Sequence, residues 1–387
     1  MSGIVVCGTG IVGLATALAL ARRGQPVSLL GPRAAVPPAA RDDYCPRVYA
    51  ISPASQAFLS GLGVWESMPA ERIAAVQAMD VHGDGDGRVD LQAWQAARAE
   101  LAWIVESSEM ERALAQAVRV MGIAWQDDRL AGYAGGVLHT EGGARLHPSL
   151  AVAADGAASP LRTAAGLPVE SRSYGAIGLV VHLDAGRPHG GTAFQWFRDD
   201  GVLGLLPLPD TADGPQVSMV WSMKEALAQQ LLALPADEQG RALRQRLAEA
   251  TGGRLGELRP RTPMHGFPLT LNSTPMIGPG LALVGDAAHR LHPLAGQGLN
   301  LGLGDAQDLA GIVAGREPWR EPGDPALLRR YRRRRAEPVL AMRLATDGLH
   351  RLFDSRAPAA AWLRNAGMRW VERLPPLKRQ LIARASL

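Results

Sequence analysis

Residues Ile4–Leu30 read IVVCGTGIVGLATALALARRGQPVSLL, and this stretch decides the fold class. A short β-branched run, a glycine-rich turn, an apolar helical pattern and a second β-branched run follow one another, which is the order of a βαβ unit. Gly24 stands where a left-handed residue is expected to end the helix. The sequence therefore predicts an α/β protein whose first sheet has parallel strands.

The glycines of the turn have the spacing G-x-G-x-x-G, at Gly8, Gly10 and Gly13. In this setting the first glycine permits the turn, the second lets backbone approach a pyrophosphate, and the third lets the helix pack closely. The first helical residues, Ile11 and Val12, present the positive end of a helix dipole, which favours a phosphate. We therefore predict a dinucleotide site; a glycine-rich turn without a ligand is the alternative.

One part of this pattern is missing at the end of the second strand. An acid is expected there for the adenosine ribose, but Gly31 occupies the position. Either another group holds the ribose, with Arg33 as a candidate for the adenylate edge, or the affinity for the dinucleotide is modest.

Two further glycine-containing motifs end apolar strands. In AADGAASPLR, from Ala153, Asp155 and Gly156 form a sharp turn, and Arg162 can reach a phosphate or clamp the loop. In GDAAHRLHPLAGQGLNLG, from Gly285, the carboxylate of Asp286 can bind sugar-like hydroxyls. The amides at the start of the helix that follows suit a delocalised anion, such as the N1/C2 oxygen edge of a reduced flavin.

The composition is that of an ordinary globular protein, with 47% hydrophobic and 20% charged residues, which excludes disordered and fibrous classes. We expect no leader, no disulfide framework, no metal site and no membrane-spanning helix, and hence a cytoplasmic protein. The basic run from Leu327 to Pro338 is predicted to be a solvated helix face, with a membrane surface or a partner as the alternative. No nucleic-acid signature is present.

The pattern of elements predicts three regions. A discontinuous dinucleotide-binding domain is expected at 1–75, 103–171 and 268–323, and a substrate domain, mostly antiparallel sheet, at 76–102 and 172–267. A helical region is expected at 324–387, with one helix from about Lys224 to Thr251 inside the substrate domain.

The three motifs together resemble the FAD-dependent aromatic hydroxylases of the p-hydroxybenzoate hydroxylase type. RVYAISPASQAFLSGLGVW, from Arg47, and FQWFRDDGVLGLLPLPD, from Phe194, resemble the ubiquinone-biosynthesis branch. The resemblance implies FAD as cofactor, with contacts from three parts of the chain. These are Gly8, Gly10, Ile11, Val12, Gly13, Arg33, Arg47 and Ser107; then Asp155, Gly156 and Arg162; and finally Gly285, Asp286, Pro293, Gly296, Gln297, Gly298, Leu299 and Asn300.

The resemblance also implies the reaction. NAD(P)H reduces the flavin transiently, and reduced flavin takes up O2 to form a C4a-hydroperoxide that hydroxylates an aromatic ring, most simply a polyprenylated phenol or quinol of ubiquinone biosynthesis. No catalytic acid or base is assigned. Candidate partners are the inner face of the membrane and other quinone-biosynthesis proteins. The alternatives are a hydroxylase of a small soluble aromatic acid and a non-catalytic, weakly FAD-binding subunit of a quinone-biosynthesis assembly.

Overall fold

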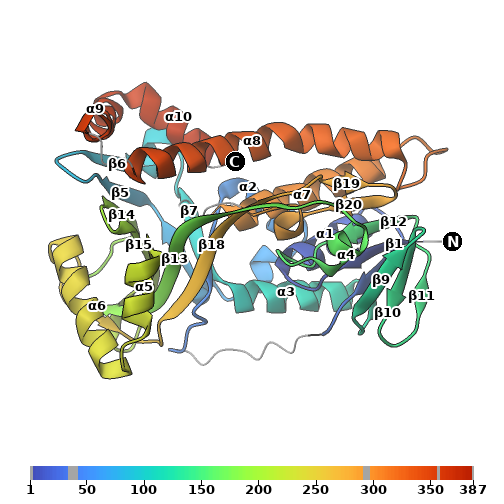
Figure 1. Ribbon diagram of the computed structural model, residues 1–387, viewed down its shortest axis with the longest axis horizontal. Helices are drawn as coiled ribbons and strands as arrows, with labels where there is room; N and C mark the ends of the chain where they lie inside the picture. Colours follow the sequence, from blue (N-terminus) through green and yellow to red (C-terminus); the bar gives the residue numbers. More distant parts are fainter. Residues whose placement is uncertain (1–2, 34–41, 291–296, 355–357, 386–387) are drawn as a thin grey trace.

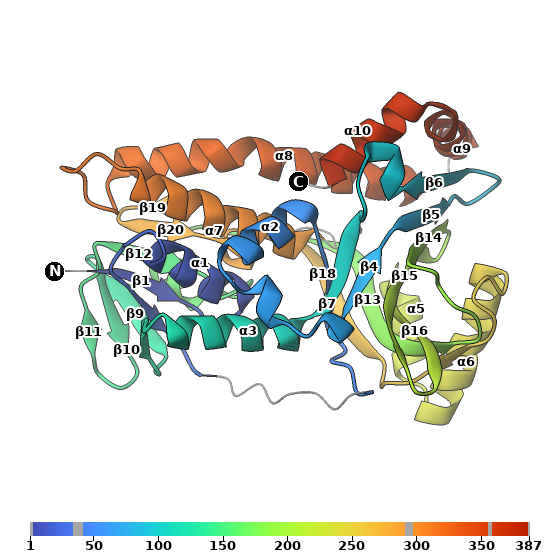
Figure 2. The ribbon, with the colours of Figure 1, turned by 180° about the vertical axis from the view of Figure 1, so that it is seen from behind.

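The computed structural model describes residues 3–33, 42–290, 297–354 and 358–385 of the chain. In this part of the chain two larger sheets lie at opposite ends of an elongated molecule (Figure 1), and a long helix runs along both of them. The fold is mixed α/β, as the sequence predicts, and Figure 2 shows the same layers from behind.

The first sheet has the strand order β19-β20-β12-β1-β2-β8, and all pairs except β19 with β20 are parallel. Its strands are β1 (Ile4–Cys7), β2 (Val27–Leu30), β8 (Ala124–Gln126), β12 (Leu150–Ala153), β19 (Ile277–Gly278) and β20 (Leu281–Leu283). Its core strands are buried and apolar on both sides, as expected of a covered parallel sheet. Because β1 lies between β2 and β12, the strand order reverses beside β1, and ligands of such sheets bind at that point.

Helices pack around this sheet. α1 contacts both α3 and α7, and α7 contacts α8. Their bounds are α1 (Ile11–Ala21), α2 (Pro53–Gly61), α3 (Ser107–Val120), α4 (Pro160–Ala164), α7 (Gly298–Ala314) and α8 (Pro325–Asp354). The glycine at 24 has φ 72°, which confirms the predicted helix-ending position.

The second sheet follows the order β21-β18-β13-β16-β15-β14-β5-β6, with β17 beside β13. Its strands are β5 (Ala78–His82), β6 (Arg88–Gln92), β13 (Glu170–Ala185), β14 (Thr192–Arg198), β15 (Gly201–Thr211), β16 (Gly214–Lys224), β17 (Leu258–Pro260), β18 (His265–Ser273) and β21 (His289–Arg290). β5 pairs with β14, so two segments far apart in sequence share this sheet. β18 runs past position 267, the expected boundary.

One face of the second sheet is covered by α5 (Glu225–Leu232) and α6 (Ala236–Thr251) (Figure 1). The prediction of one helix from Lys224 to Thr251 is wrong, because the helix ends at Leu232 and restarts after Pro235. Proline has no backbone N–H to donate, and it disfavours helical backbone in the residue before it.

Two small sheets complete the described strands. β3 (Val48–Ile51), β7 (Ala102–Glu106) and β4 (Ile73–Val76) form one sheet, which packs against β15 of the second sheet. β9 (Leu130–Ala134), β10 (Val137–Thr140) and β11 (Arg145–Leu146) form an antiparallel sheet beside the first sheet (Figure 1).

The C-terminal region is helical, with α9 (Pro358–Arg373) and α10 (Pro375–Ala385) following α8. It is attached to the β6 hairpin, since Lys378 Nζ donates to the carbonyl of Asp90 at 2.8 Å and the amide of Asp90 donates to Glu372 at 2.8 Å. No described helix combines the length and the hydropathy needed to cross a bilayer.

Candidate cofactor site

The turn between β1 and α1 has one glycine that the protein itself does not need. A Cβ on Gly8 would lie 2.2 Å from the carbonyl oxygen of Ala154, and a Cβ on Gly13 would lie 2.1 Å from the carbonyl oxygen of Gly8. A Cβ on Gly10 meets nothing within 4 Å, and Gly10 has an ordinary φ of −80°. No side chain caps the helix that starts at Ile11. The open space at Gly10 and the uncapped amides are the features that a bound phosphate group requires.

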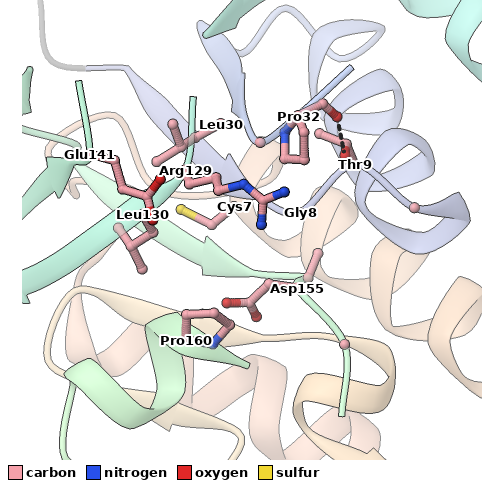
Figure 3. Close-up of a pocket in the computed structure, with 14 residues that line it drawn as sticks. Cys7, Gly8, Thr9, Leu30, Pro32, Arg129, Leu130, Glu141, Asp155 and Pro160 are labelled. Atoms are coloured by element: carbon pink, nitrogen blue, oxygen red, sulfur yellow. Dashed lines mark hydrogen bonds between the residues drawn. The ribbon is translucent and has the colours of Figure 1, made fainter. Parts of the chain in front are cut away.

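A cavity of about 490 Å³ opens in front of this turn (Figure 3). It lies at the carboxyl ends of β1, β2 and β12, where a dinucleotide is expected, and its size is within the range of small-molecule sites. Its lining residues are Cys7, Gly8, Thr9, Gly10, Leu30, Gly31, Pro32, Arg129, Leu130, Glu141, Ala154, Asp155, Gly156 and Pro160.

The loop after β12 is held by its own side chains. Asp155 accepts hydrogen bonds from the hydroxyl of Ser159 and from the amide of Leu161, so its carboxylate organises the start of α4. Burial raises the pKa of Asp155. The buried guanidinium of Arg162 donates to the carbonyls of Ala157 at 2.7 Å and Ala287 at 2.9 Å. Of the two roles expected for Arg162, the structure therefore provides the clamp, which joins this loop to the turn after β20.

The turn after β20 packs directly on α1 and α7. Gly285 and Gly302 lie against each other and against the Val12 side chain, and a Cβ on Gly302 would lie 2.9 Å from Val12 Cγ2 and 3.0 Å from Gly285 Cα. The amide of Gly285 donates to the carboxylate of Asp305 at 2.9 Å. These contacts fix where Asp286, the next residue, points.

Asp286 and Arg47 are the two charged groups that remain available here. The Arg47 guanidinium lies over the ring of Tyr49, 5.2 Å from its centroid, and Asp286 is half-buried near the same tyrosine. Burial raises the pKa of Tyr49 to about 12, with Arg47 acting in the opposite direction and Asp286 in the same direction. Among the described residues no ion pair is recorded for either charge, so both can meet a polar ligand.

The start of α7 is tied to β3. Asn300 donates to the carbonyl of Ala50 at 2.8 Å and to Gln297 at 2.9 Å, and its carbonyl accepts from the amide of Ser52 at 3.0 Å. No side chain caps the amides of this helix, and a Cβ on Gly298 would meet nothing within 4 Å.

The remaining predicted residues have other surroundings. The side chain of Leu299 packs in the core, so only its backbone is available to a ligand. Ser107 is buried beside Cys45, and its amide donates to the carbonyl of Arg47 at 2.9 Å. Arg33 donates to the carbonyl of Trp125 and stacks over that ring, outside the residues that line the cavity. Pro293 and Gly296 lie outside the described residues.

The central part of the second sheet presents a face without charged side chains toward this site, with Asp184 and Lys224 only near its ends and Ser218 and Ser222 among its polar members. Successive strand residues alternate between faces, and the face opposite α5 and α6 carries Val180, Val202, Leu206, Val220 and Gln195 in its central part. Leu206 packs with β3 of the cofactor side. On the same face His182, fully buried, hydrogen-bonds the carbonyl of Cys45 at 2.8 Å, and burial lowers the pKa of its imidazole.

Several residues with a part in this site carry no sequence signal that we used. A buried ion pair of Arg72 with Glu106, 2.6 Å between Nη2 and Oε2, holds the segment that leads to Arg47. Arg129, just before β9, and Glu141, just after β10, line the cavity. Of the residues that the sequence analysis missed, only Asp305 could have been found from the sequence, because it is an acid within an apolar helical pattern.

We call the open space at Gly10, together with the uncapped amides at the start of α1, the cradle. The fold and the cradle define a dinucleotide-binding flavoprotein with a second sheet beside the cofactor site. The sequence matches the FAD binding domain family over residues 1–344. The chain therefore belongs to this family of FAD-dependent aromatic hydroxylases and is a flavoprotein monooxygenase with FAD as its cofactor, as the sequence predicts.

Three relatives illustrate the likeness. Ubiquinone hydroxylase UbiL of Rhodospirillum rubrum is 33% identical, over 100% of this chain and 89% of its own. The 3-demethoxyubiquinol 3-hydroxylase of Escherichia coli is 31% identical, over 98% of this chain and 97% of its own. The structure of PqsL, a probable FAD-dependent monooxygenase from Pseudomonas aeruginosa, superimposes with a TM-score of 0.76 at 21% identity, covering 95% of this chain and 99% of that one. This last likeness concerns the fold alone.

Proposed function

We propose that the protein hydroxylates the ring of a neutral, apolar phenol or quinol, a polyprenylated precursor of ubiquinone. The names of the two relatives support this substrate class. The observation that carries it is the central part of the second sheet, whose face opposite α5 and α6 carries Val180, Val202, Leu206 and Val220 and no charged side chain, and which contacts β3 through Leu206. A small aromatic acid would need a cation for its carboxylate, because a buried charge without a partner is costly.

We further propose how this chain holds FAD. The diphosphate lies at Gly10 and the amides of Ile11 and Val12, with Arg47 as its cation, while Asp286 accepts hydrogen bonds from the ribityl chain. The flavin ring lies at the start of α7. This arrangement is supported by the open cradle and by the two unpaired charges.

FAD, when bound, supplies hydride acceptance from NAD(P)H and activation of O2. The chain supplies binding, orientation and exclusion of water. We propose that the uncharged central face of the second sheet covers the ring side of the site. The hydrogen bonds of Asn300 to Ala50 and Ser52 hold the start of α7 against β3 and the residue that follows it. The open cradle favours an FAD-dependent enzyme over the alternative from the sequence, a non-catalytic subunit that binds FAD weakly. We also propose the domain division at 1–75, 103–171 and 268–323, at 76–102 and 172–267, and at 324–387.

The proposed reaction is tested with purified holoprotein. We expect NAD(P)H oxidation to rise when a short-chain prenylated phenol is added, with ¹⁸O from ¹⁸O2 found in the product by mass spectrometry. 4-Hydroxybenzoate should give no such rise. If only the carboxylate-bearing ring is hydroxylated, the proposed substrate class is wrong.

A charge on the sheet face should disturb this preference. In Val220→Lys we expect kcat/KM for the prenylated phenol to fall roughly tenfold or more, because the ammonium must be desolvated beside an apolar ring. Val120→Lys, at an exposed valine of α3, is the matched control and should behave like the unaltered protein. Equal losses in both variants would contradict the assignment of this face.

We also propose that the C-terminal helices rest on an anionic membrane surface. Large apolar side chains are exposed on all of them, namely Leu340, Leu344, Trp370 and Leu381, and Leu374 between α9 and α10 is also exposed. On α8 the spacing of Arg333, Leu340 and Leu344 puts a basic and two apolar residues on one face. A basic amphipathic helix of this kind is suited to lie in the interface of a bilayer.

The membrane proposal is tested by co-sedimentation with vesicles of phosphatidylglycerol and phosphatidylethanolamine. Replacing Leu344 and Trp370, 64% and 70% exposed, with serine should lower the bound fraction several-fold while leaving flavin absorbance unchanged. Trp319→Ser, at a tryptophan 78% exposed in the loop before α8, is the control. Binding that survives the double substitution, or falls equally in the control, would count against this surface.

A further inference from the structure

The backbone at the end of β2 leaves no room for the acidic side chain that dinucleotide sites of this type use to bind the ribose. Gly31 has φ +150°, a conformation that L side chains rarely adopt, and a Cβ there would lie 2.8 Å from Thr9 Cγ2. Thr9 is itself fixed, since its hydroxyl donates to the carbonyl of Pro32 at 2.8 Å. No side chain can therefore reach the ribose from this position.

Arg33, which the sequence suggests for the adenosine end, already contacts other groups of the protein. Arg33 donates from its guanidinium to the carbonyl of Trp125 at 3.3 Å, and the guanidinium carbon lies 5.3 Å from the centroid of the Trp125 ring. Its amide donates to Asp127 at 3.0 Å. These contacts direct Arg33 to the end of β8 and away from the cavity.

Two charged side chains enter the cavity from a different part of the chain. The β9 and β10 strands pair Leu130 with Thr140, and one step further the amide of Glu141 donates to the carbonyl of Arg129 at 2.9 Å. Arg129 and Glu141 are thus cross-strand neighbours at the rim. In Figure 3 the Arg129 guanidinium lies between Gly8 and Asp155, and Glu141 lies beside Leu130. No ion pair is recorded between either side chain and another described residue.

We propose that Arg129 and Glu141 hold the adenosine diphosphate half of FAD, in place of the acid that Gly31 lacks. The Glu141 carboxylate accepts hydrogen bonds from the ribose hydroxyls, and the Arg129 guanidinium pairs with the phosphate on the adenosine side of the diphosphate. This inference rests on the proposed binding of FAD at the cradle of Gly10. The antiparallel sheet β9–β11 is therefore a part of the cofactor site.

The test measures affinity on protein freed of flavin. Apo-protein is titrated by calorimetry with FAD, with ADP alone and with riboflavin 5′-phosphate. We expect Glu141→Gln and Arg129→Gln each to weaken FAD and ADP roughly tenfold or more, the scale of one hydrogen bond with a charged partner. Riboflavin 5′-phosphate has no adenosine and should bind all forms equally.

Matched controls separate the site from general charge effects. Glu170→Gln and Arg145→Gln remove an exposed acid on β13 and an exposed base on β11, and both should bind FAD like the unaltered protein. The thermal midpoints of all apo-proteins should agree, because every altered residue is exposed.

The outcomes are distinct. FAD affinities equal to that of the unaltered protein in Glu141→Gln and Arg129→Gln would overturn the inference and leave the cofactor assignment intact. The inference also fails, again without touching the cofactor assignment, if riboflavin 5′-phosphate is weakened as much as FAD. If the unaltered protein takes up no FAD at all, the proposed function fails with it.

Discussion

Gly10→Asp is expected to abolish FAD binding while leaving the apo-protein folded. The backbone at Gly10 has φ −80°, which any residue adopts, and a Cβ there meets nothing within 4 Å. Aspartate is a favoured residue at the start of a helix, so the apo-protein should gain a few tenths of a kcal/mol. The carboxylate would occupy the cradle and repel the diphosphate, and affinity should fall about 100-fold or more.

Two variants show that this result belongs to the cradle. Gly10→Ala adds a methyl group without charge, so it should weaken FAD less than Gly10→Asp does. Gly8→Ala should destabilise the apo-protein itself, because its Cβ would lie 2.2 Å from the carbonyl oxygen of Ala154. The measurements are FAD titration and apo-protein thermal unfolding. Retention of flavin by Gly10→Asp would show that the diphosphate lies elsewhere.

The sequence predicted those parts of the fold that local patterns specify. The strand, turn and helix around Gly8 are encoded in residues close together in the chain. The glycines of this turn were predicted correctly because the backbone conformation and the close contacts there leave little room for a side chain. The break at Pro235 is also local, and the prediction of one continuous helix gave the proline too little weight against the leucine and alanine spacing around it.

Contacts between distant strands could not be predicted in the same way. Arg129 and Glu141 enter the cavity only because β9–β11 folds beside β1 and β2, and neither residue belongs to a motif. Arg162 was assigned to the loop after Asp155, whereas the structure has it in the short helix α4, and its choice between phosphate and carbonyl partners depends on Ala287, which is 125 positions away. Such choices are made by tertiary packing, which one sequence without relatives does not contain.

Asp305→Ala is expected to cause the largest loss of stability among these variants. Its carboxylate is fully buried and accepts from the amide of Gly285 at 2.9 Å, from His289 at 2.7 Å and from Arg335 at 2.6 Å. Removing it leaves the buried guanidinium of Arg335 without its closest counter-charge. Breaking a buried pair in this way costs about 3 to 5 kcal/mol, which should appear as a fall in the thermal midpoint.

The pH dependence of this loss follows from the same contacts. Burial alone would raise the pKa of Asp305, but the interactions with His289 and Arg335 outweigh it and hold the pKa below its usual range. A carboxyl with a lowered folded-state pKa stabilises the protein above its unfolded-state value and loses that contribution as pH falls through the folded-state pKa. The difference between the unaltered protein and Asp305→Ala should therefore be complete at neutral pH and shrink below about pH 4.

Two further variants test whether the uncompensated charge is the cause. Asp308→Ala removes a more exposed acid that also contacts Arg335, at 3.2 Å, and should cost at most about 1 kcal/mol. Asp305→Ala combined with Arg335→Met removes both buried charges, so part of the lost stability should return. If the double variant is instead as unstable as the sum of its single changes, the loss comes from packing and from the freed amide of Gly285. The flavin affinity of Asp305→Ala then reports how far the turn that carries Asp286 depends on this carboxylate.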